Sequence, residues 1–288
     1  MEHAIVLKNL CKNYKDFSLK NVSFSVPKGC IMGFIGENGA GKTTTLKAIL
    51  GLIHIDGGSV EVLGKNPFTQ RREINTDIGA VLDNSFFYEG MRTKDISSVM
   101  AKLHPAWDSA LFVRYCERFA LPAAKSIKEY SKGMKAKLSL ATALSHHPKL
   151  LILDEATSGL DPVVRNEFLD IFMEFIEDEE HTILLSSHIT SDLEKIADYI
   201  TFIHDGEIVF SETKDDMMEC YGVVKCAKAD AALLPAELII GRRESKFDME
   251  LLVKNKSKIQ AAHPDFLLES ASIDDIMTFF AHKGAYDA

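Results

Sequence analysis

The segment GENGAGKTT, residues 36–44, has the composition of a phosphate-binding loop. It fits the spacing G-x-x-x-x-G-K-[ST] and lies between the apolar run CIMGFIG and the run TTTLKAILGLI, which has helical spacing. Gly39 and Gly41 allow backbone N–H groups to approach phosphates closely, and Lys42 can reach the β- and γ-phosphates. The alternative is a glycine-rich turn with a surface lysine. We expect these residues to bind the phosphates of a nucleotide: Gly36, Asn38, Gly39, Ala40, Gly41, Lys42, Thr43 and Thr44.

A second segment, LLILDEAT, places two carboxylates directly after a predicted buried strand. Sheets of the α/β class bind their ligands at the carboxyl ends of such strands. Asp154 is expected to hold Mg²⁺ together with the Thr43 hydroxyl, and Glu155 to polarise the water that attacks the γ-phosphate. The alternative is a solvated helix-cap pair. Together with the phosphate-binding loop, the two carboxylates indicate a nucleotide hydrolase or a kinase.

A third segment, EYSKGMKAKLSLATAL at residues 129–144, predicts a second anion site. Ser131 and Gly133 stand where a run of good helix formers begins. The free N–H groups of a helix start, with a hydroxyl beside them, favour an anion. The alternative is an ordinary helix N-cap by Ser131.

The order and spacing of YSKGM, LSLATAL, LILDEATSGLDP and LLSSHI resemble the ATP-binding cassette family, the motor subunits of ABC transporters. The resemblance covers roughly residues 3–215. It implies that Ser131 and Gly133 belong to the signature sequence, which binds the γ-phosphate held by the phosphate-binding loop of a partner cassette. Lys132 and Met134 depart from the commonest form, LSGGQ.

The same resemblance implies roles for further residues. Asp161 matches the D-loop residue that contacts the opposite subunit, and His188 matches the switch histidine that contacts the γ-phosphate. Tyr14 matches the aromatic residue that stacks on adenine, although an aromatic residue at a strand end is often part of a core. Asp83 stands where the family has a glutamine that contacts Mg²⁺ and water, so it is a candidate catalytic and metal-binding residue. Asn84 is its neighbouring alternative.

The segment SFFYEGM follows Asp83. In the family this region forms a groove that receives a short cytoplasmic helix of the membrane subunit. Phe86, Phe87 and Tyr88 are expected either to line that groove or to fill the space between the core and the helical part.

The elements that must position these residues follow from the hydrophobic pattern. Short alternating runs in the first ninety residues predict strands, and residues 93–147 have apolar residues at three- and four-residue steps, which predicts helices. The runs KLLILDEAT and HTILLSSHI predict buried parallel strands on either side of the helix PVVRNEFLDIFMEFIEDE. After about residue 215, three short possible strands and the amphipathic run SIDDIMTFFAHK predict a small α+β appendage.

The expected fold class is therefore α/β, a P-loop NTPase of the ABC cassette type with a RecA-like core. An N-terminal antiparallel β subdomain, a helical subdomain at about residues 84–149 and a small C-terminal α+β appendage complete it. We expect an ABC ATP-binding domain over residues 1–215 and an accessory domain over residues 216–288.

Composition limits the class of partner. The 288 residues include 42 acidic and 33 basic side chains, a formal charge of −9, which disfavours a nucleic acid as the main partner. No apolar run reaches the roughly 18–20 residues of a membrane-spanning helix, and a signal peptide is not indicated. The five cysteines are expected to be free thiols. We expect a cytoplasmic protein that binds the membrane peripherally through a permease.

These features together predict an ATP-hydrolysing subunit that dimerises head to tail around two Mg·ATP and powers an ABC exporter. Its partners would be a separate transmembrane permease and a second copy of itself or a related cassette. The resemblance is greatest to bacterial exporters of the ABC-2 kind, including those that expel drugs and antimicrobial or amphipathic peptides such as phenol-soluble modulins. The alternatives are an importer cassette, a soluble cassette ATPase that acts on ribosomes or DNA, and a binding module with impaired hydrolysis.

Overall fold

The computed structural model describes residues 2–82, 87–244 and 248–281. Its centre is a six-stranded sheet with the order β5-β6-β7-β3-β8-β9. These strands are β5 (Ile78–Val81), β6 (Leu150–Asp154), β7 (Thr182–Ser187), β3 (Ile31–Ile35), β8 (Tyr199–His204) and β9 (Glu207–Thr213). The first five run parallel, and β9 pairs antiparallel with β8. Strands β3, β6 and β7 are buried along their whole length, which is why they read as continuous apolar runs.

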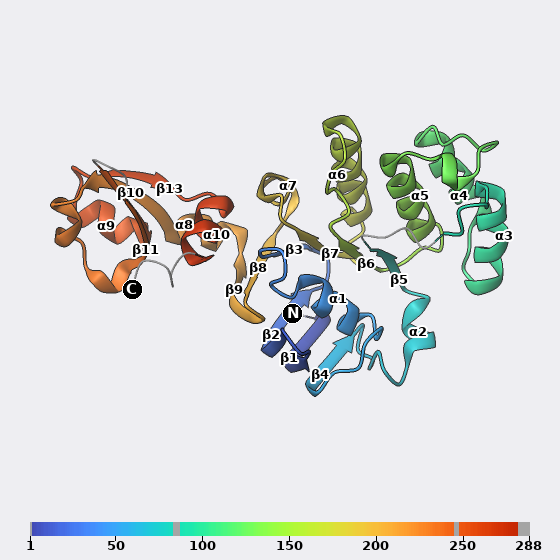
Figure 1. The fold of residues 1–288 in the computed structure, drawn as a ribbon, viewed down its shortest axis with the longest axis horizontal. Helices are drawn as coiled ribbons and strands as arrows, with labels where there is room; N and C mark the ends of the chain where they lie inside the picture. The colour runs from blue at the N-terminus through green and yellow to red at the C-terminus, as the bar shows by residue number, and fades with distance from the viewer. Residues whose placement is uncertain (1, 83–86, 245–247, 282–288) are drawn as a thin grey trace.

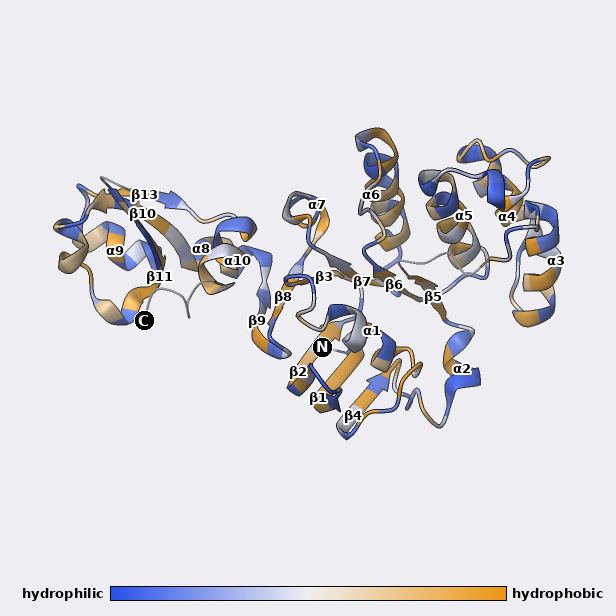
Figure 2. Ribbon diagram, viewed as in Figure 1, coloured by the Kyte–Doolittle hydropathy of each residue, from blue (hydrophilic) through white to orange (hydrophobic). Residues whose placement is uncertain are grey.

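An antiparallel sheet of three strands packs against one face of the central sheet. It has the order β2-β1-β4 and comprises β1 (His3–Asn13), β2 (Ser18–Pro27) and β4 (Gly57–Val62). Phe24 of β2 stacks on Phe34 of β3, with 5.3 Å between the ring centroids. Helix α1 (Lys42–Ile49) contributes to the same core, and Figure 2 shows the apolar residues concentrated in β1 and β2.

The other face of the central sheet is covered by helices. Leu151 and Leu153 of β6 point to this side, where Phe168 and Phe172 are fully buried. The helices of this layer and of the helical subdomain are α2 (Arg71–Asn75), α3 (Thr93–Leu103), α4 (Ser109–Arg118), α5 (Lys132–Leu144), α6 (Pro162–Ile176) and α7 (Thr190–Ile196), with a short 3-10 turn at Ile127–Glu129. Figure 1 shows α3, α4 and α5 grouped beyond β5, at the end of the sheet opposite β9.

A four-stranded antiparallel sheet with the order β11-β12-β10-β13 forms the C-terminal part. Its elements are α8 (Lys214–Cys220), β10 (Tyr221–Ala227), β11 (Ile239–Glu244), β12 (Asp248–Lys254), α9 (Lys256–Ala262), β13 (Leu267–Ser270) and α10 (Ile273–Ala281), with 3-10 turns at Asp230–Leu233 and Ala236–Leu238. One face of this sheet has a small core of its own around Val224, Leu251 and Ile259. The other face joins the main core through Val223 and Leu252.

The predicted fold class is confirmed, with the strands, the helical subdomain and the α+β appendage in the predicted order. The sequence reasoning did not single out the hairpin β8-β9, the helices α8 and α9, or strand β13. Within the described ranges, every helix is too short or too polar to cross a lipid bilayer.

Candidate nucleotide-binding and catalytic site

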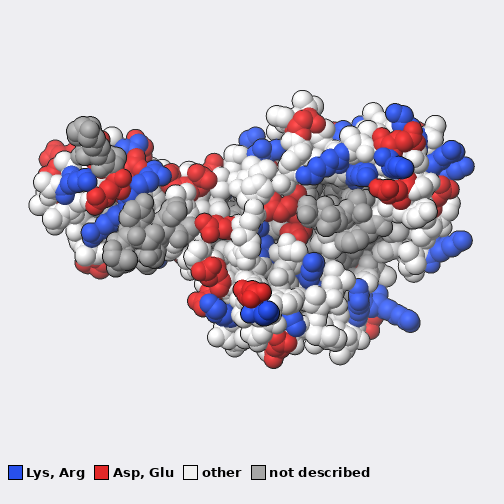
Figure 3. Space-filling view, viewed as in Figure 1, with Lys and Arg blue, Asp and Glu red and all other residues white. Residues whose placement is uncertain are grey.

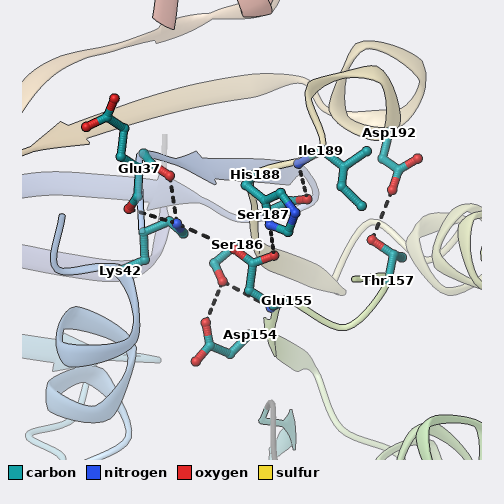
Figure 4. Close-up of polar contacts among 11 residues, drawn as sticks. Glu37, Lys42, Asp154, Glu155, Thr157, Ser186, Ser187, His188, Ile189 and Asp192 are labelled. Atoms are coloured by element: carbon teal, nitrogen blue, oxygen red, sulfur yellow. Dashed lines mark hydrogen bonds and ion pairs between the residues drawn. The ribbon is translucent and has the colours of Figure 1, made fainter. Parts of the chain in front are cut away.

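The candidate site lies where three neighbouring parallel strands end. Strands β6, β7 and β3 are adjacent in the sheet and run in the same direction. Asp154 and Glu155 come at the end of β6, His188 follows β7, and the loop from Gly36 follows β3. Residues that are up to 152 positions apart in the chain therefore meet at one edge of the sheet, as Figure 4 shows.

The phosphate-binding loop requires glycine at two of its positions for steric reasons. Gly41 has φ +113°, and a Cβ there would lie 2.6 Å from Cδ2 of Leu19. A Cβ on Gly36 would lie 2.4 Å from the carbonyl oxygen of Ile203. By contrast, the space around Gly39 is open, and its φ is +87°. The loop thus packs tightly against the protein at its two ends and exposes backbone between them, as a cradle for phosphates does.

Lys42 is the first residue of α1 and is only 6% exposed. Its ammonium donates hydrogen bonds to the carbonyl oxygens of Gly36, at 2.7 Å, and Glu37, at 3.3 Å. The ammonium also lies 3.4 Å from Oε1 of Glu155. The lysine is therefore held inside the loop and beside the carboxylate that the sequence predicts as the catalytic base.

Glu155 has a left-handed backbone conformation with φ +52°, which is uncommon for a residue other than glycine. Its N–H donates to the carbonyl oxygen of Ser186 at 3.1 Å and to the Ser186 hydroxyl at 3.2 Å. Its Oε2 lies 2.6 Å from Nδ1 of His188. Glu155 therefore joins all three strand ends, through Ser186 and His188 of the β7 side and Lys42 of the β3 side.

Asp154 is 1% exposed, and its Oδ1 accepts a hydrogen bond from the Ser186 hydroxyl at 2.6 Å. Ser186 thus orients Asp154 and Glu155 together. The motif LLSSHI contains this serine, but the sequence alone predicted no role for it. The available signal was its place at the end of a strand, two residues before His188.

The residues present fit a nucleoside triphosphate and its magnesium ion. Oε1 of Glu155 is buried and makes no hydrogen bond within the described part of the chain, although it faces the Lys42 ammonium. A buried polar oxygen without a hydrogen bond favours a further donor at this point. The loop N–H groups and Lys42 suit phosphate oxygens, while the Thr43 hydroxyl and the Asp154 carboxylate suit a hard divalent cation.

The residues that the sequence predicts as the signature, Ser131 and Gly133, lie at the start of α5. Ser131 is the N-cap, and its hydroxyl accepts a hydrogen bond from the N–H of Met134 at 3.2 Å. A cleft of about 530 Å³ lies between α5 and the end of β6, lined by Lys132 and Lys135 on one side and by Asp154 and Glu155 on the other. Figure 3 shows further lysine and arginine side chains over the helical part of the molecule.

Asp161 is the N-cap of α6, where its Oδ1 accepts hydrogen bonds from the N–H groups of Val163 and Val164, both at 3.1 Å. Val163 beside it is 77% exposed. No contact between Asp161 and the phosphate-binding loop is found in the described ranges. The structure of one chain therefore leaves Asp161 at the surface, where a second chain would have access to it.

Tyr14 lies in the turn after β1 and is 48% exposed. The Lys12 ammonium lies 5.4 Å from the centre of the Tyr14 ring. The backbone N–H of Tyr14 donates a hydrogen bond to the carbonyl oxygen of Phe17. The Phe17 ring reaches the phosphate-binding loop, because its Cζ lies 2.9 Å from the position of a Cβ on Gly41. The turn with the exposed tyrosine therefore borders the loop, and Phe17 is a contact that the sequence reasoning missed.

Asp83, Asn84 and Phe86, three candidates from the sequence, lie outside the described residues. Phe87 lines an apolar groove of about 560 Å³ between α2, β5, α3 and α5, whereas Tyr88 is 76% exposed. The groove is lined by Leu50, Leu52, Arg71, Asn75, Ile78, Ala80, Val81, Leu82, Phe87, Met100, His104, Ser139, Thr142, Ala143 and His146. Phe87 also packs against the main core, which agrees with the expectation that it fills space between the core and the helical part.

Two histidines contact each other in the wall of this groove, with their rings tilted by 34°. The rings of His104 and His146 have centroids 4.4 Å apart, and Nε2 of His146 lies 3.0 Å from the carbonyl oxygen of Ile78. Burial lowers the pKa of His146. Burial also lowers the pKa of His104, and the charge on a protonated His146 would lower it further. Both imidazoles are therefore more readily neutral than a solvated histidine.

Comparison with known proteins identifies the family. The family model described as ABC transporter matches residues 19–158. The bacitracin transport ATP-binding protein BcrA of Bacillus licheniformis is 35% identical over 212 residues, which cover 73% of this chain and 69% of BcrA. The chain belongs to the ABC transporter family. Its ABC cassette is also 35% identical, over 212 residues, to the lantibiotic transport ATP-binding protein SrtF of Streptococcus pyogenes, covering 73% of this chain and 90% of SrtF.

Solved structures agree with this ABC transporter assignment. An ATP-binding subunit of an ABC transporter is 27% identical and superposes with a TM-score of 0.67, covering 74% of this chain and 91% of that one. A dimeric ATP-binding cassette bound to ADP and Pi has a TM-score of 0.66 over 73% of this chain and 98% of its own, and at 21% identity it shows the fold alone. The predictions of an ABC ATP-binding subunit and of an ATPase are confirmed.

Proposed function

We propose that this ABC subunit hydrolyses ATP to power an exporter of antimicrobial or amphipathic peptides. The observation that carries the hydrolytic part is the position of Glu155, in contact with both Lys42 and His188. The transport of bacitracin and of a lantibiotic, named for two relatives at 35% identity, supports a peptide as the substrate. The C-terminal sheet and α10 follow the cassette as an accessory unit, and we propose the division into residues 1–215 and 216–288.

In the proposed reaction, Glu155 accepts a proton from the water that attacks the γ-phosphate. His188 lies 2.6 Å from the same carboxylate and would orient it while its other ring nitrogen contacts the γ-phosphate. The Lys42 ammonium would exchange its bonds to the loop carbonyls for the β- and γ-phosphate oxygens. Tyr14, half exposed beside the loop, would stack on the adenine.

Thr43 and Asp154 would hold Mg²⁺, which supplies positive charge to the phosphate oxygens as the bond breaks. Asp154 is suited to this because the Ser186 hydroxyl fixes its orientation in a buried position. The part assigned to Asp83 remains a proposal from the sequence.

Dimerisation is the second part of the proposal. Ser131 and Gly133 at the start of α5 would bind the γ-phosphate of a second cassette, because the first N–H groups of a helix have no partners within it. Asp161, exposed at the start of α6, would contact the opposite subunit. Such a dimer closes when the γ-phosphate is bound by both chains and opens after hydrolysis.

The third part is a separate permease at the membrane. The apolar groove that contains Phe87 has the size and character of a binding site for an amphipathic helix. We propose that a cytoplasmic helix of the permease binds there and holds this subunit at the cytoplasmic face of the membrane.

The decisive experiment compares the parent chain with Glu155→Gln. The parent should hydrolyse ATP in a Mg²⁺-dependent reaction, and the variant should lose about 100-fold or more of its turnover because glutamine cannot accept the proton. Since Lys42 and the loop are unchanged, Glu155→Gln should still bind ATP and accumulate as a nucleotide-bound dimer in size-exclusion chromatography with light scattering. Lys42→Ala is the control that should lose ATP binding itself.

Absence of turnover by the parent, even together with its permease, would refute the motor function. The substrate class is tested separately, in cells that express the subunit with its permease. The parent should raise resistance to a membrane-active peptide, and Glu155→Gln should not.

A further inference from the structure

A buried carboxylate on α7 connects the two segments that carry the proposed catalytic residues. Asp192 has no exposed surface. Its Oδ2 accepts a hydrogen bond from the Thr157 hydroxyl at 2.9 Å, and its Oδ1 accepts one from Nε of Arg165 at 2.6 Å. Arg165 in turn donates through Nη2 to the Ser191 hydroxyl at 2.9 Å.

The positions of these residues in the chain give the contacts their meaning. Thr157 follows Glu155 by two residues, and Asp192 follows His188 by four. The Thr157–Asp192 hydrogen bond therefore links the same two segments as the Glu155–His188 contact. Figure 4 shows the two links next to each other, with the Thr157–Asp192 pair on the side away from Lys42.

A fully buried carboxylate is costly unless charged and polar groups compensate it. Packing alone would be served as well by an apolar pair of the same volume, since such replacements are often neutral or stabilising. The polar link differs from an apolar contact in being directional, because a short hydrogen bond fixes both distance and angle. Arg165, anchored on the fifteen-residue helix α6, adds a rigid third point.

We propose that Asp192 is a positioning residue for ATP hydrolysis. By holding Thr157 and Arg165, it fixes the separation between Glu155 and His188 and so keeps the carboxylate oriented toward the attacking water. This inference rests on the proposed function, in which Glu155 is the base and His188 the γ-phosphate contact. It adds a residue that acts only through others, at a distance from the nucleotide.

The test removes one hydrogen bond and leaves the charged pair intact. Thr157→Val replaces the hydroxyl by a methyl group of similar shape, and Thr157→Ser is the matched control that keeps the hydroxyl. In the complete chain, Thr157→Val should lower kcat for ATP about tenfold or more while KM changes by less than about twofold, because positioning affects the reacting geometry and not the phosphate-binding loop. Thr157→Ser should restore most of kcat.

A second measurement separates positioning from a merely structural effect. The second measurement is single-turnover hydrolysis in a His188→Ala background. If the Thr157–Asp192 link acts through His188, adding Thr157→Val there should lower the rate little further, because the effects of substitutions at coupled residues are not additive. An equal fold-loss in both backgrounds would overturn the proposal, as would a Thr157→Val variant with the kcat of the parent.

These outcomes are distinct from a failure of the proposed function, which would appear as a parent without ATP turnover or a Glu155→Gln variant as active as the parent. Asp192→Asn serves as the second variant, because it keeps the volume but gives Arg165 a neutral partner. It should reproduce the loss in kcat with KM retained. Loss of ATP binding in both Thr157→Val and Asp192→Asn would contradict the positioning role.

Discussion

At the scale of single residues, the candidate site is distinguished by the conformation of Glu155. A left-handed backbone at a residue other than glycine costs on the order of 1 kcal/mol, so the surrounding contacts must hold it. Here Ser186 accepts the Glu155 N–H twice, through its carbonyl and its hydroxyl. The strained residue is also the one in contact with Lys42 and His188, which agrees with the tendency of strain to gather at functional sites.

A second residue-scale property is the titration of His146. Burial lowers its pKa, so between the unfolded value of about 6.5 and the lower folded value the unfolded chain binds more protons than the folded one. The contribution of the neutral, buried His146 to the free energy of unfolding is therefore fully present above about pH 6.5 and is lost as the pH falls below that value. We predict that His146→Gln, which retains a donor for the carbonyl of Ile78, loses stability less steeply on acidification than the parent.

The measurement is the free energy of unfolding from urea titrations at several pH values between about 5 and 7.5. His54→Gln makes the same substitution at an exposed histidine and serves as the control for the substitution itself. If parent and His146→Gln have the same slope, the buried imidazole contributes no pH dependence.

At the scale of elements, the start of α5 combines a structural and a proposed binding role in one hydroxyl. Ser131 caps the helix through the Met134 N–H and would also contact the γ-phosphate of a partner cassette. Aspartate caps helices as well as serine does, but it would place a negative charge against the phosphate. We predict that Ser131→Asp keeps the free energy of unfolding within about 0.5 kcal/mol of the parent and abolishes ATP-driven dimerisation.

The dimerisation test is made in the Glu155→Gln background, by light scattering with and without ATP. Ser131→Ala is the counterpart, which should lower the free energy of unfolding by about 1 kcal/mol because the cap is lost. A Ser131→Asp chain that dimerises normally with ATP would show that this helix start does not face a phosphate.

At the scale of the whole molecule, the C-terminal part is attached to the helix that follows His188. Helix α10 packs against α7, and Oε1 of Glu194 on α7 accepts the N–H of Ile273 at 3.0 Å. Ser272 and Asp275 exchange hydrogen bonds at the start of α10, and its Phe280 ring contacts Phe202 and Phe210 of the central sheet. The C-terminal sheet is therefore joined to the short helix that follows His188.

We predict that Glu194→Ala weakens this attachment by about 1 kcal/mol, because the first N–H of α10 loses a charged acceptor. Hydrogen exchange measured by mass spectrometry should become several-fold faster in residues 273–281 and remain unchanged in β6 and β7. Glu194→Gln keeps an acceptor oxygen and should lie between the parent and Glu194→Ala. Unchanged exchange in Glu194→Ala would mean that apolar packing alone attaches α10.

Much of the fold was predictable because its signals are local. The short apolar runs of β3, β6 and β7 indicated buried strands, and helical spacing marked α3 to α6. The hairpin β8-β9 was missed although the sequence carries a signal for it, the dipeptide Asp205-Gly206 between the two strands, where both residues have positive φ. Strand β13 was missed because only four residues pair and most of them are exposed.

The sequence by itself determined the chemistry of the site, since the loop glycines, Lys42, Asp154, Glu155 and Ser131 are recognised by residue type and spacing within short segments. The tertiary structure alone decided which of these groups meet. The contact of Glu155 with Lys42 and His188, the bridging role of Ser186 and the burial of Asp192 between Thr157 and Arg165 depend on the order of strands in the sheet. That order is set by the packing of apolar faces over the whole chain, which no short segment encodes.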